Sequence, residues 1–354
     1  MGGVEAHVQE LYPRIAGICP SLGVNVAMRT PYVEAGAREW GGLRLWPIWA
    51  SRNKFLETIT HTLIALFYLR YRRRCDAVHL HAIGPGLLVP LARLLGLRVL
   101  FTHHGRDYDR AKWNRPAKAV LQFGEWLSVR FSDEVIVVSE RLTEALRQRF
   151  PQQAQRITFV PNGASLTFVN ASRSPDPAVL ASLGIEAGQY ILGVGRLVPE
   201  KGFDDLIAAH LASNDARKLV IAGKADHADG YAKSLLAKAG DRIVFAGFQT
   251  HEALRSLYAG AALFVLPSHH EGLPIAALEA LAMDTPTLLS DIAPNEELGL
   301  SPEHYFPTGD IAALAERLKA PQDRYAVDGS VLRERYDWDK IAAQTAAIID
   351  RLRR

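Results

Sequence analysis

Two glutamates beside a glycine form the strongest chemical signal in the sequence. Residues 268–280 read Ser-His-His-Glu-Gly-Leu-Pro-Ile-Ala-Ala-Leu-Glu-Ala and follow a short apolar run. Gly272 permits a tight turn, and Pro274 suits the first position of a helix, where its missing N–H costs no hydrogen bond. Glu271 therefore lies near a helix N-terminus, which favours anions, and Glu279 lies within the helix. The alternative is a surface helix whose two glutamates are only solvated.

A second segment supplies positive charge. Residues 193–203 read Gly-Val-Gly-Arg-Leu-Val-Pro-Glu-Lys-Gly-Phe. Gly195 lets the backbone approach a ligand closely. Arg196 can grip two phosphate oxygens in a fork, and Lys201 acts as a point charge. Alone, this segment could be an ordinary basic turn, but together with the glutamate segment it indicates a diphosphate site.

Apolar runs of strand length alternate with helical patterns along the chain. They contain Val, Ile, Leu and Phe with little alternation, as expected of strands buried on both faces. The runs are 24–30, 77–83, 98–104, 134–140, 157–160, 190–194, 219–222, 242–246, 263–266 and 287–290. This order predicts parallel sheets covered by helices.

Two prolines among small polar residues mark a linker at 172–177. We therefore expect α/β domains at 1–172 and 178–335, followed by an amphipathic helix at 336–354. Ligands of open parallel sheets bind at the carboxyl ends of the strands, and two such domains facing each other form an interdomain cleft. The chemically active residues should follow strands.

These segments together resemble glycosyltransferase family 4, a retaining family with the GT-B fold. The resemblance rests on the glutamate pair, on the Gly-Arg-Leu…Glu-Lys-Gly segment, on Val-Pro-Asn-Gly at 160–163 and on the Trp-containing segment 336–341. It implies two Rossmann-like domains facing an interdomain cleft, with the second binding the nucleotide sugar. It also implies that Gly195, Arg196 and Lys201 bind the donor diphosphate.

The resemblance also implies which residues bind the sugar, the ribose and the base of the donor. Glu271, a catalytic candidate, would hold the donor sugar with help from the backbone amides of Gly272 and Leu273. Glu279 would bind the ribose, and Phe248 would flank the base. No acidic pair with divalent-metal spacing stands at a strand end, so we expect no metal and no cofactor beyond the donor substrate.

The first domain contributes histidines after the run at 98–104. His104, directly before a glycine, best matches the family residue near the transferred sugar, so we take it as catalytic. His103 is the fallback, and Asp107 would help to shape the acceptor site. The alternative is a structural histidine at a strand end. His79 and His81, after another strand, are expected to be structural.

Gly2 and Gly3 resemble the family's glycine-rich loop, which contacts donor and acceptor. The strand that should precede this loop is absent. Either the true start lies upstream, or the sheet lacks its innermost strand, which would leave backbone groups unpaired. Pro13 should kink the helix that follows.

Composition narrows the setting. The formal net charge of +3 is too small to indicate a nucleic-acid partner, and two cysteines among 354 residues suit a reducing cytoplasm. The sequence has no signal-peptide pattern and no long apolar run. The segment 55–71 carries an apolar face and leads into Arg72, Arg73 and Arg74. It suits a helix lying on an anionic membrane, or a core helix with a solvated end, which we favour.

We therefore expect a cytoplasmic retaining glycosyltransferase, with peripheral membrane contact as an option. It would move a sugar from a nucleotide-sugar donor to a glycan or lipid-linked acceptor in surface polysaccharide or glycolipid synthesis. The alternatives are a non-catalytic sugar-nucleotide-binding protein, suggested by the absent strand, and a sugar-nucleotide epimerase of the same fold. Fold alone does not separate them, but the glutamate pair with Arg196 and Lys201 favours the transferase.

Overall fold

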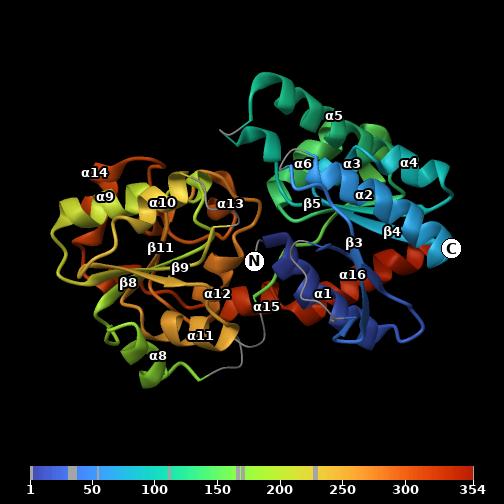
Figure 1. The fold of residues 1–354 in the computed structure, drawn as a ribbon. Helices are drawn as coiled ribbons and strands as arrows, with labels where there is room; N and C mark the ends of the chain where they lie inside the picture. The colour runs from blue at the N-terminus through green and yellow to red at the C-terminus, as the bar shows by residue number, and fades with distance from the viewer. Residues whose placement is uncertain are drawn as a thin grey trace. The chain divides into compact units, whose positions relative to one another are not determined.

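The computed structural model describes residues 3–30, 38–53, 56–110, 113–164, 168, 172–225 and 230–353. The chain divides into two compact units (Figure 1). The N-terminal unit consists of 4–162 together with 339–354, and the C-terminal unit contains 163–338. The change between units therefore comes earlier than the predicted linker. The last helix does not stand apart, as the sequence suggested, but belongs to the N-terminal unit.

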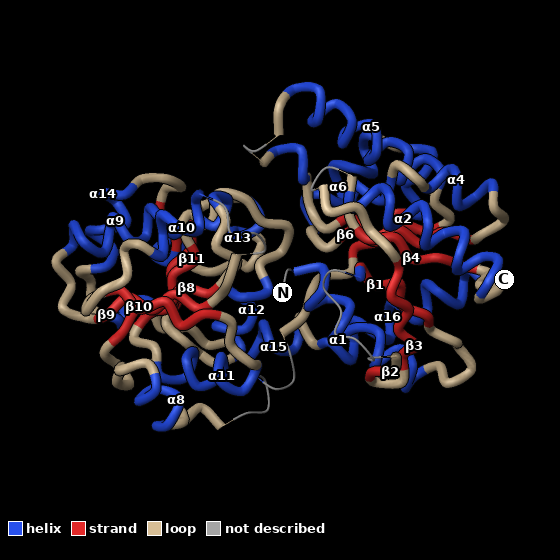
Figure 2. Tube along the Cα trace, viewed as in Figure 1, coloured by secondary structure: helices blue, strands red, loops and turns tan. Residues whose placement is uncertain are grey.

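The C-terminal unit contains a six-stranded parallel sheet with the order β10-β9-β8-β11-β12-β13. Strands β8, β9, β10 and β11 of this sheet are drawn in red in Figure 2. The strands are β8 Tyr190–Val194, β9 Lys218–Ala222, β10 Ile243–Gly247, β11 Leu263–Leu266, β12 Thr287–Ser290 and β13 Tyr305–Phe306. The first five confirm the predicted runs. The edge strand β13 was missed because two residues carry no periodic signal. Strands β8, β11 and β12 are completely buried, which explains their unbroken apolar sequences.

Helices cover both faces of this sheet, with α9 and α10 on one side and α11 and α12 on the other (Figure 1). The α-helices are α8 Pro177–Ser182, α9 Phe203–Ser213, α10 Gly230–Leu236, α11 His251–Gly260, α12 Ile275–Ala282, α13 Ala293–Glu296, α14 Ile311–Leu318 and α15 Ser330–Arg335. The 3-10 helices are η5 Pro199–Lys201, η6 Pro302–His304 and η7 Gln322–Tyr325. Leu206 on α9 and Val265 on β11 belong to the same fully buried core.

The N-terminal unit contains two separate sheets. One is parallel with the order β4-β5-β6-β7, and the other has the order β1-β3-β2, in which β1 is parallel and β2 antiparallel to β3. The strands are β1 Asn25–Arg29, β2 Glu39–Trp40, β3 Leu43–Ile48, β4 Ala77–His81, β5 Arg98–His103, β6 Glu134–Val137 and β7 Ile157–Phe159. The sequence predicted all of these except β2 and β3.

Strands β1 and β4 are edge strands of the two separate sheets. Each of β1 and β4 has one hydrogen-bonded neighbour, β3 and β5 respectively. Over the described part of the chain, no strand joins these two edges. Side chains supply polar contacts nearby: Trp46 Nε1 donates to Asn25 Oδ1 at 2.8 Å, and Asn25 Nδ2 lies 3.7 Å from Cys75 Sγ.

The helices of this unit lie on both sides of the strands, with α4 and α5 on one side and α1 and α16 on the other (Figure 1). They are α1 Gly3–Ile18, α2 Glu57–Phe67, the π-helix η2 Tyr68–Arg72, α3 Ile83–Gly86, α4 Val89–Leu94, η3 Asp107–Asp109, α5 Arg115–Phe131, α6 Glu140–Arg149, η4 Pro151–Arg156 and α16 Trp338–Arg353. The helix α1 continues through Pro13. Arg351 Nε on α16 donates a hydrogen bond to Glu134 Oε1 at 3.1 Å, which links this helix to β6.

Candidate donor and acceptor sites

The two sequence segments predicted to bind the donor meet in the C-terminal unit. Strands β8 and β11 are parallel neighbours, so the loops at their carboxyl ends lie side by side. Gly202 has φ +63°, and a Cβ there would lie 2.2 Å from the carbonyl oxygen of Pro267. The His269 N–H donates to the Glu200 carbonyl at 2.9 Å. Glycine at 202 is therefore needed for the β8 loop to pack against the β11 loop.

An ion pair joins these two loops. Lys201 Nζ lies 2.5 Å from Glu271 Oε1, which also accepts a hydrogen bond from Ser268 Oγ at 2.6 Å. The side chains of Lys201 and Glu271 are only 17% and 11% exposed. Both groups of such a pair are partly removed from water, so a charged ligand beside them interacts with them more strongly than it would in water. A phosphate could share the ammonium, while the carboxylate accepts hydrogen bonds from hydroxyls.

The backbone around the pair is closely packed. Gly195 follows β8, and a Cβ there would lie 3.3 Å from Lys201 Cδ. A Cβ on Gly223 would lie 1.8 Å from the Gly195 carbonyl oxygen. Arg196 is partly buried in the same loop. The structure therefore places Gly195, Arg196, Lys201 and Glu271 at adjacent strand ends.

The helix after β11 begins later than predicted. Pro274 is the N-cap of α12 and not its first helical residue, so Glu271 and Gly272 lie in the preceding loop. Leu273, also in this loop, is buried. Glu279 in α12 is 8% exposed and accepts a hydrogen bond from Tyr258 Oη at 3.0 Å. Tyr258, on α11 before β11, was not among the residues predicted from the sequence.

Phe248 lies after β10, at the carboxyl end of a different strand of the same sheet. Its side chain is 52% exposed, and Lys224 Nζ lies 5.2 Å from the centre of its ring. An exposed ring flanked by a cation suits stacking against a base. Its role beside the base remains a prediction.

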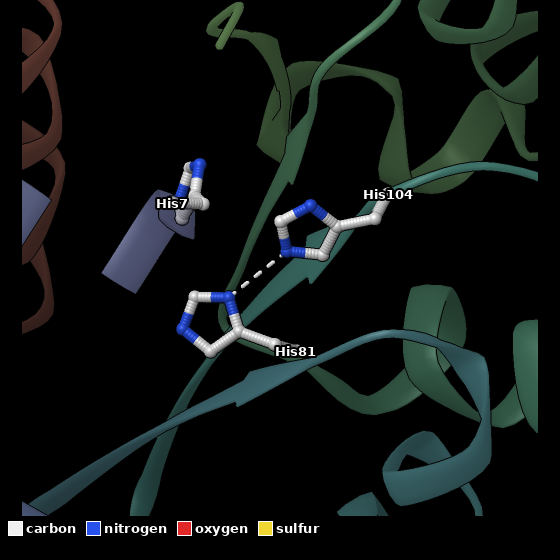
Figure 3. Close-up of side chains that lie close together, drawn as sticks. All are labelled: His7, His81 and His104. Carbon is white, nitrogen blue, oxygen red and sulfur yellow. Dashed lines mark hydrogen bonds between the residues drawn. The ribbon is translucent and has the colours of Figure 1, made fainter. Parts of the chain in front are cut away.

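In the N-terminal unit, His104 lies in a group of histidines. His81 ends β4, His104 follows β5, and His7 comes from α1 (Figure 3). His81 Nδ1 lies 3.1 Å from His104 Nε2, and the His7 ring centre is 4.9 Å from that of His104. Burial lowers the pKa of His7 to about 4 and those of His81 and His104 well below 6.5. All three are therefore neutral at pH 7.

His103 is enclosed and has a partner at each ring nitrogen. It is completely buried, its Nε2 lies 3.0 Å from Glu125 Oε1, and the Gly105 N–H donates to its Nδ1 at 3.2 Å. Because Nδ1 accepts, the neutral ring carries its proton on Nε2. This arrangement favours His104 over His103 as the residue that meets a substrate. Asp107 pairs with Arg110 at 2.8 Å.

The remaining candidates fall into two groups. His79 contacts Tyr12 Oη and has Nε2 2.6 Å from Thr102 Oγ1, which is consistent with the structural role expected of it. Gly2 lies outside the described residues, and Gly3 begins α1. The role of a glycine loop there stays a prediction.

Two family models match the chain, one in each half. Residues 1–168 match the model described as Glycosyltransferase Family 4, and residues 180–320 match Glycosyl transferases group 1. An alpha-maltose-1-phosphate synthase of Mycolicibacterium smegmatis is 30% identical over 98% of this chain and 95% of its own length. The chain belongs to glycosyltransferase family 4. This family 4 protein is thus a glycosyltransferase, as its sequence predicted.

A second relative of this family 4 protein is similar over a shorter stretch. An uncharacterised glycosyltransferase of Methanocaldococcus jannaschii is 31% identical over 63% of this chain, and the match spans 61% of that protein. Solved structures show the fold. A sucrose-phosphate synthase from Thermosynechococcus elongatus has a TM-score of 0.81 at 23% identity, covering 99% of this chain and 94% of its own. The Anabaena protein HepE, solved with UDP-glucose, has a TM-score of 0.77 at 16% identity, covering 99% and 96%. The fold is GT-B.

Proposed function

We propose that this protein is a retaining glycosyltransferase that uses a nucleoside diphosphate sugar as donor. The observation that supports this most strongly is the Lys201–Glu271 pair at the adjoining ends of β8 and β11. Such a pair offers a cation for the diphosphate next to a carboxylate for the sugar hydroxyls. UDP-sugars are the first donors to test, because the similar fold of HepE was solved with UDP-glucose.

These residues contribute to the reaction mainly through electrostatic stabilisation. The bond between the anomeric carbon and the diphosphate oxygen breaks, and the acceptor oxygen bonds to the same face of that carbon. Arg196 and Lys201 stabilise the charge that develops on the departing diphosphate. The departing phosphate takes the acceptor proton. Glu271 holds the sugar, Glu279 holds the ribose, and His104 of the N-terminal unit orients a sugar hydroxyl.

The acceptor is a glycan or a lipid-linked glycan in this proposal, and the helices of the N-terminal unit support contact with a membrane. The helix α2 buries Ala65 and Leu66 but leaves Phe67 44% exposed, and Tyr71 on η2 is 64% exposed. The exposed face of α2 and η2 therefore includes apolar side chains. Arg72, Arg73 and Arg74 are exposed beside it.

A second apolar surface lies on α5. Phe123 and Trp126 stack with ring centres 5.8 Å apart, and their side chains are 55% and 40% exposed. The short helix α3 packs against both α2 and α5. Exposed aromatic residues near basic residues suit the interface of an anionic bilayer. No helix in the described ranges is long and apolar enough to span a membrane.

The transferase is tested by product formation with a panel of nucleotide sugars. Lys201→Ala should lower turnover about 100-fold, because a preorganised charge at the leaving group is lost. Glu271→Gln should reduce it by a comparable factor, and Lys233→Ala, an exposed residue of α10, should leave it unchanged. The anomeric configuration of the product, read by NMR, tests retention.

Three results would contradict the proposal. Donor hydrolysis or transfer that is unaffected by both site changes would remove the site assignment. UDP binding without any product would favour the non-catalytic alternative. Interconversion of the donor sugar without an acceptor would favour the epimerase.

Membrane contact is tested by sedimentation with vesicles. We expect binding to anionic vesicles that weakens at high salt, because each basic residue near the surface contributes about 1 kcal/mol. Replacing Phe123 and Trp126 by serine should reduce it several-fold, whereas Val331→Ser, at an exposed apolar position of α15, should not. Equal partitioning to neutral and anionic vesicles would exclude this contact.

A further inference from the structure

The three histidines around His104 come from separate parts of the N-terminal unit. His7 lies on α1, His81 at the end of β4 and His104 just after β5, and one nitrogen of each lies within 4.8 Å of the other two (Figure 3). His81 Nδ1 and His104 Nε2 are 3.1 Å apart. In a tetrahedral site with metal–nitrogen bonds of about 2.0–2.1 Å, neighbouring ligand nitrogens are about 3.3 Å apart. This pair therefore already has nearly the right separation, and the proton of its hydrogen bond moves to the other nitrogen of its ring when an ion binds.

The third histidine is held by a contact of the kind that ligating histidines make. His7 Nδ1 lies 2.9 Å from Asn162 Oδ1, and this bond is buried. Because the amide oxygen accepts, Nδ1 carries the proton and Nε2 is the nitrogen with the lone pair. A hydrogen bond that fixes the tautomer and orientation of the ring is the usual support of a metal ligand.

A rigid neighbour supports His81. Its ring stacks on that of His79 with centres 4.0 Å apart. His79 is itself held between Tyr12 and Thr102. Two of the three rings therefore have fixed surroundings, so little ordering would be needed when an ion binds.

The chemistry of the group selects one class of ion. Three imidazole nitrogens suit Zn²⁺, Co²⁺, Ni²⁺ or Cu²⁺ and do not suit Mg²⁺ or Ca²⁺, which prefer oxygen. With three protein ligands, a fourth position stays open for water or an anion.

We propose that His7, His81 and His104 bind a divalent transition-metal ion such as Zn²⁺, and that this ion inhibits sugar transfer. The site departs from the sequence-based expectation of a metal-free protein. Inhibition follows because an ion that holds His104 removes it from the sugar. This second part rests on the proposed function, whereas metal binding does not.

Binding is tested on the full chain after treatment with a chelator. Titration with Co²⁺ should give the visible absorption of a tetrahedral nitrogen site at one ion per chain, and calorimetry with Zn²⁺ should give the same stoichiometry. Mg²⁺ should show no binding. His7→Gln and His81→Gln should each weaken binding about tenfold or more.

The control is His269→Gln. His269 pairs with Asp205 at 2.8 Å in the C-terminal unit and is 43% exposed, so it represents adventitious surface binding. Its replacement should leave the Co²⁺ spectrum unchanged. Far-UV circular dichroism and urea unfolding verify that each variant is folded. A folded His7→Gln chain with wild-type Co²⁺ affinity would overturn the site, as would the absence of stoichiometric binding.

The inhibitory part is tested by adding Zn²⁺ to an active preparation. Transfer should fall as the site fills and return after chelation, and His7→Gln should require about tenfold more Zn²⁺ for the same loss. Full activity at saturating Zn²⁺ would overturn inhibition. A chain without transferase activity that still gives the Co²⁺ spectrum would contradict the proposed function and leave the metal site standing.

Discussion

The carboxylate of Glu125 holds several side chains next to His104 in place. It is completely buried on α5 and accepts hydrogen bonds from His103 Nε2 at 3.0 Å and from Tyr108 Oη at 3.1 Å, and it pairs with Arg149. Burial by itself would raise the pKa of Glu125, but the hydrogen bond from His103 and the charge of Arg149 lower it overall. Glu125 thus fixes the residue that directly precedes His104.

Glu125→Ala should destabilise the N-terminal unit by about 3 kcal/mol, because His103 and Tyr108 would keep buried donors without an acceptor. Urea unfolding measures this change. Glu144→Ala, at an exposed position of the neighbouring helix α6, is the control and should change stability by less than about 0.5 kcal/mol. Equal effects of the two substitutions would show that Glu125 is not a structural centre.

At the scale of elements, the loop after β8 depends on the backbone of Gly202. Gly202→Ala should weaken UDP binding about tenfold or more, since φ +63° and contact with Pro267 would force the loop to move. Gly240→Ala is a suitable control, because a Cβ there meets nothing within 4 Å. Calorimetry with UDP measures both. Unchanged affinity in Gly202→Ala would show that the loop geometry does not position the cations.

The strands of the C-terminal unit other than β13 were predictable almost to the residue, and those of the N-terminal unit only in part. Buried parallel strands such as β8 and β11 are uninterrupted apolar runs, so sequence alone locates them. β3 was missed because its buried and exposed residues alternate and Pro47 interrupts it. Glu125 gave no signal, because a single glutamate in a helix is usually solvated.

The site was predictable where residues follow strands that are neighbours in the sheet. Glu271 follows β11 and Lys201 follows β8, and adjacent parallel strands bring them together. The grouping of His7 with His81 and His104 was not predictable, because it needs the position of α1 against the strand ends. Sequence spacing says nothing about that distance.

For the whole molecule, buried and half-buried histidines predict sensitivity to acid. Burial lowers the pKa of His7 to about 4 from about 6.5, and those of His79, His81 and His104 also fall. Between these values the unfolded chain binds protons that the folded chain does not, so stability is present above pH 6.5 and is lost as the pH falls towards 4. Each unit of pKa shift corresponds to about 1.4 kcal/mol.

Unfolding by urea, followed as a function of pH, measures this loss. Stability should fall steeply between about pH 6.5 and pH 4. In His79→Gln, which lacks one of these groups, the free energy of unfolding should fall less steeply with decreasing pH in this range. A flat profile down to pH 5 would show that the histidines are not buried in their neutral form.

The return of α16 to the N-terminal unit has a consequence for how the protein is made. Ile341, Ala346 and Leu352 are buried, and Arg351 reaches β6. The ribosome makes these residues after β6 and after every strand of the C-terminal unit. The N-terminal unit therefore lacks α16 until that helix has been translated. By then the C-terminal unit already has all its strands.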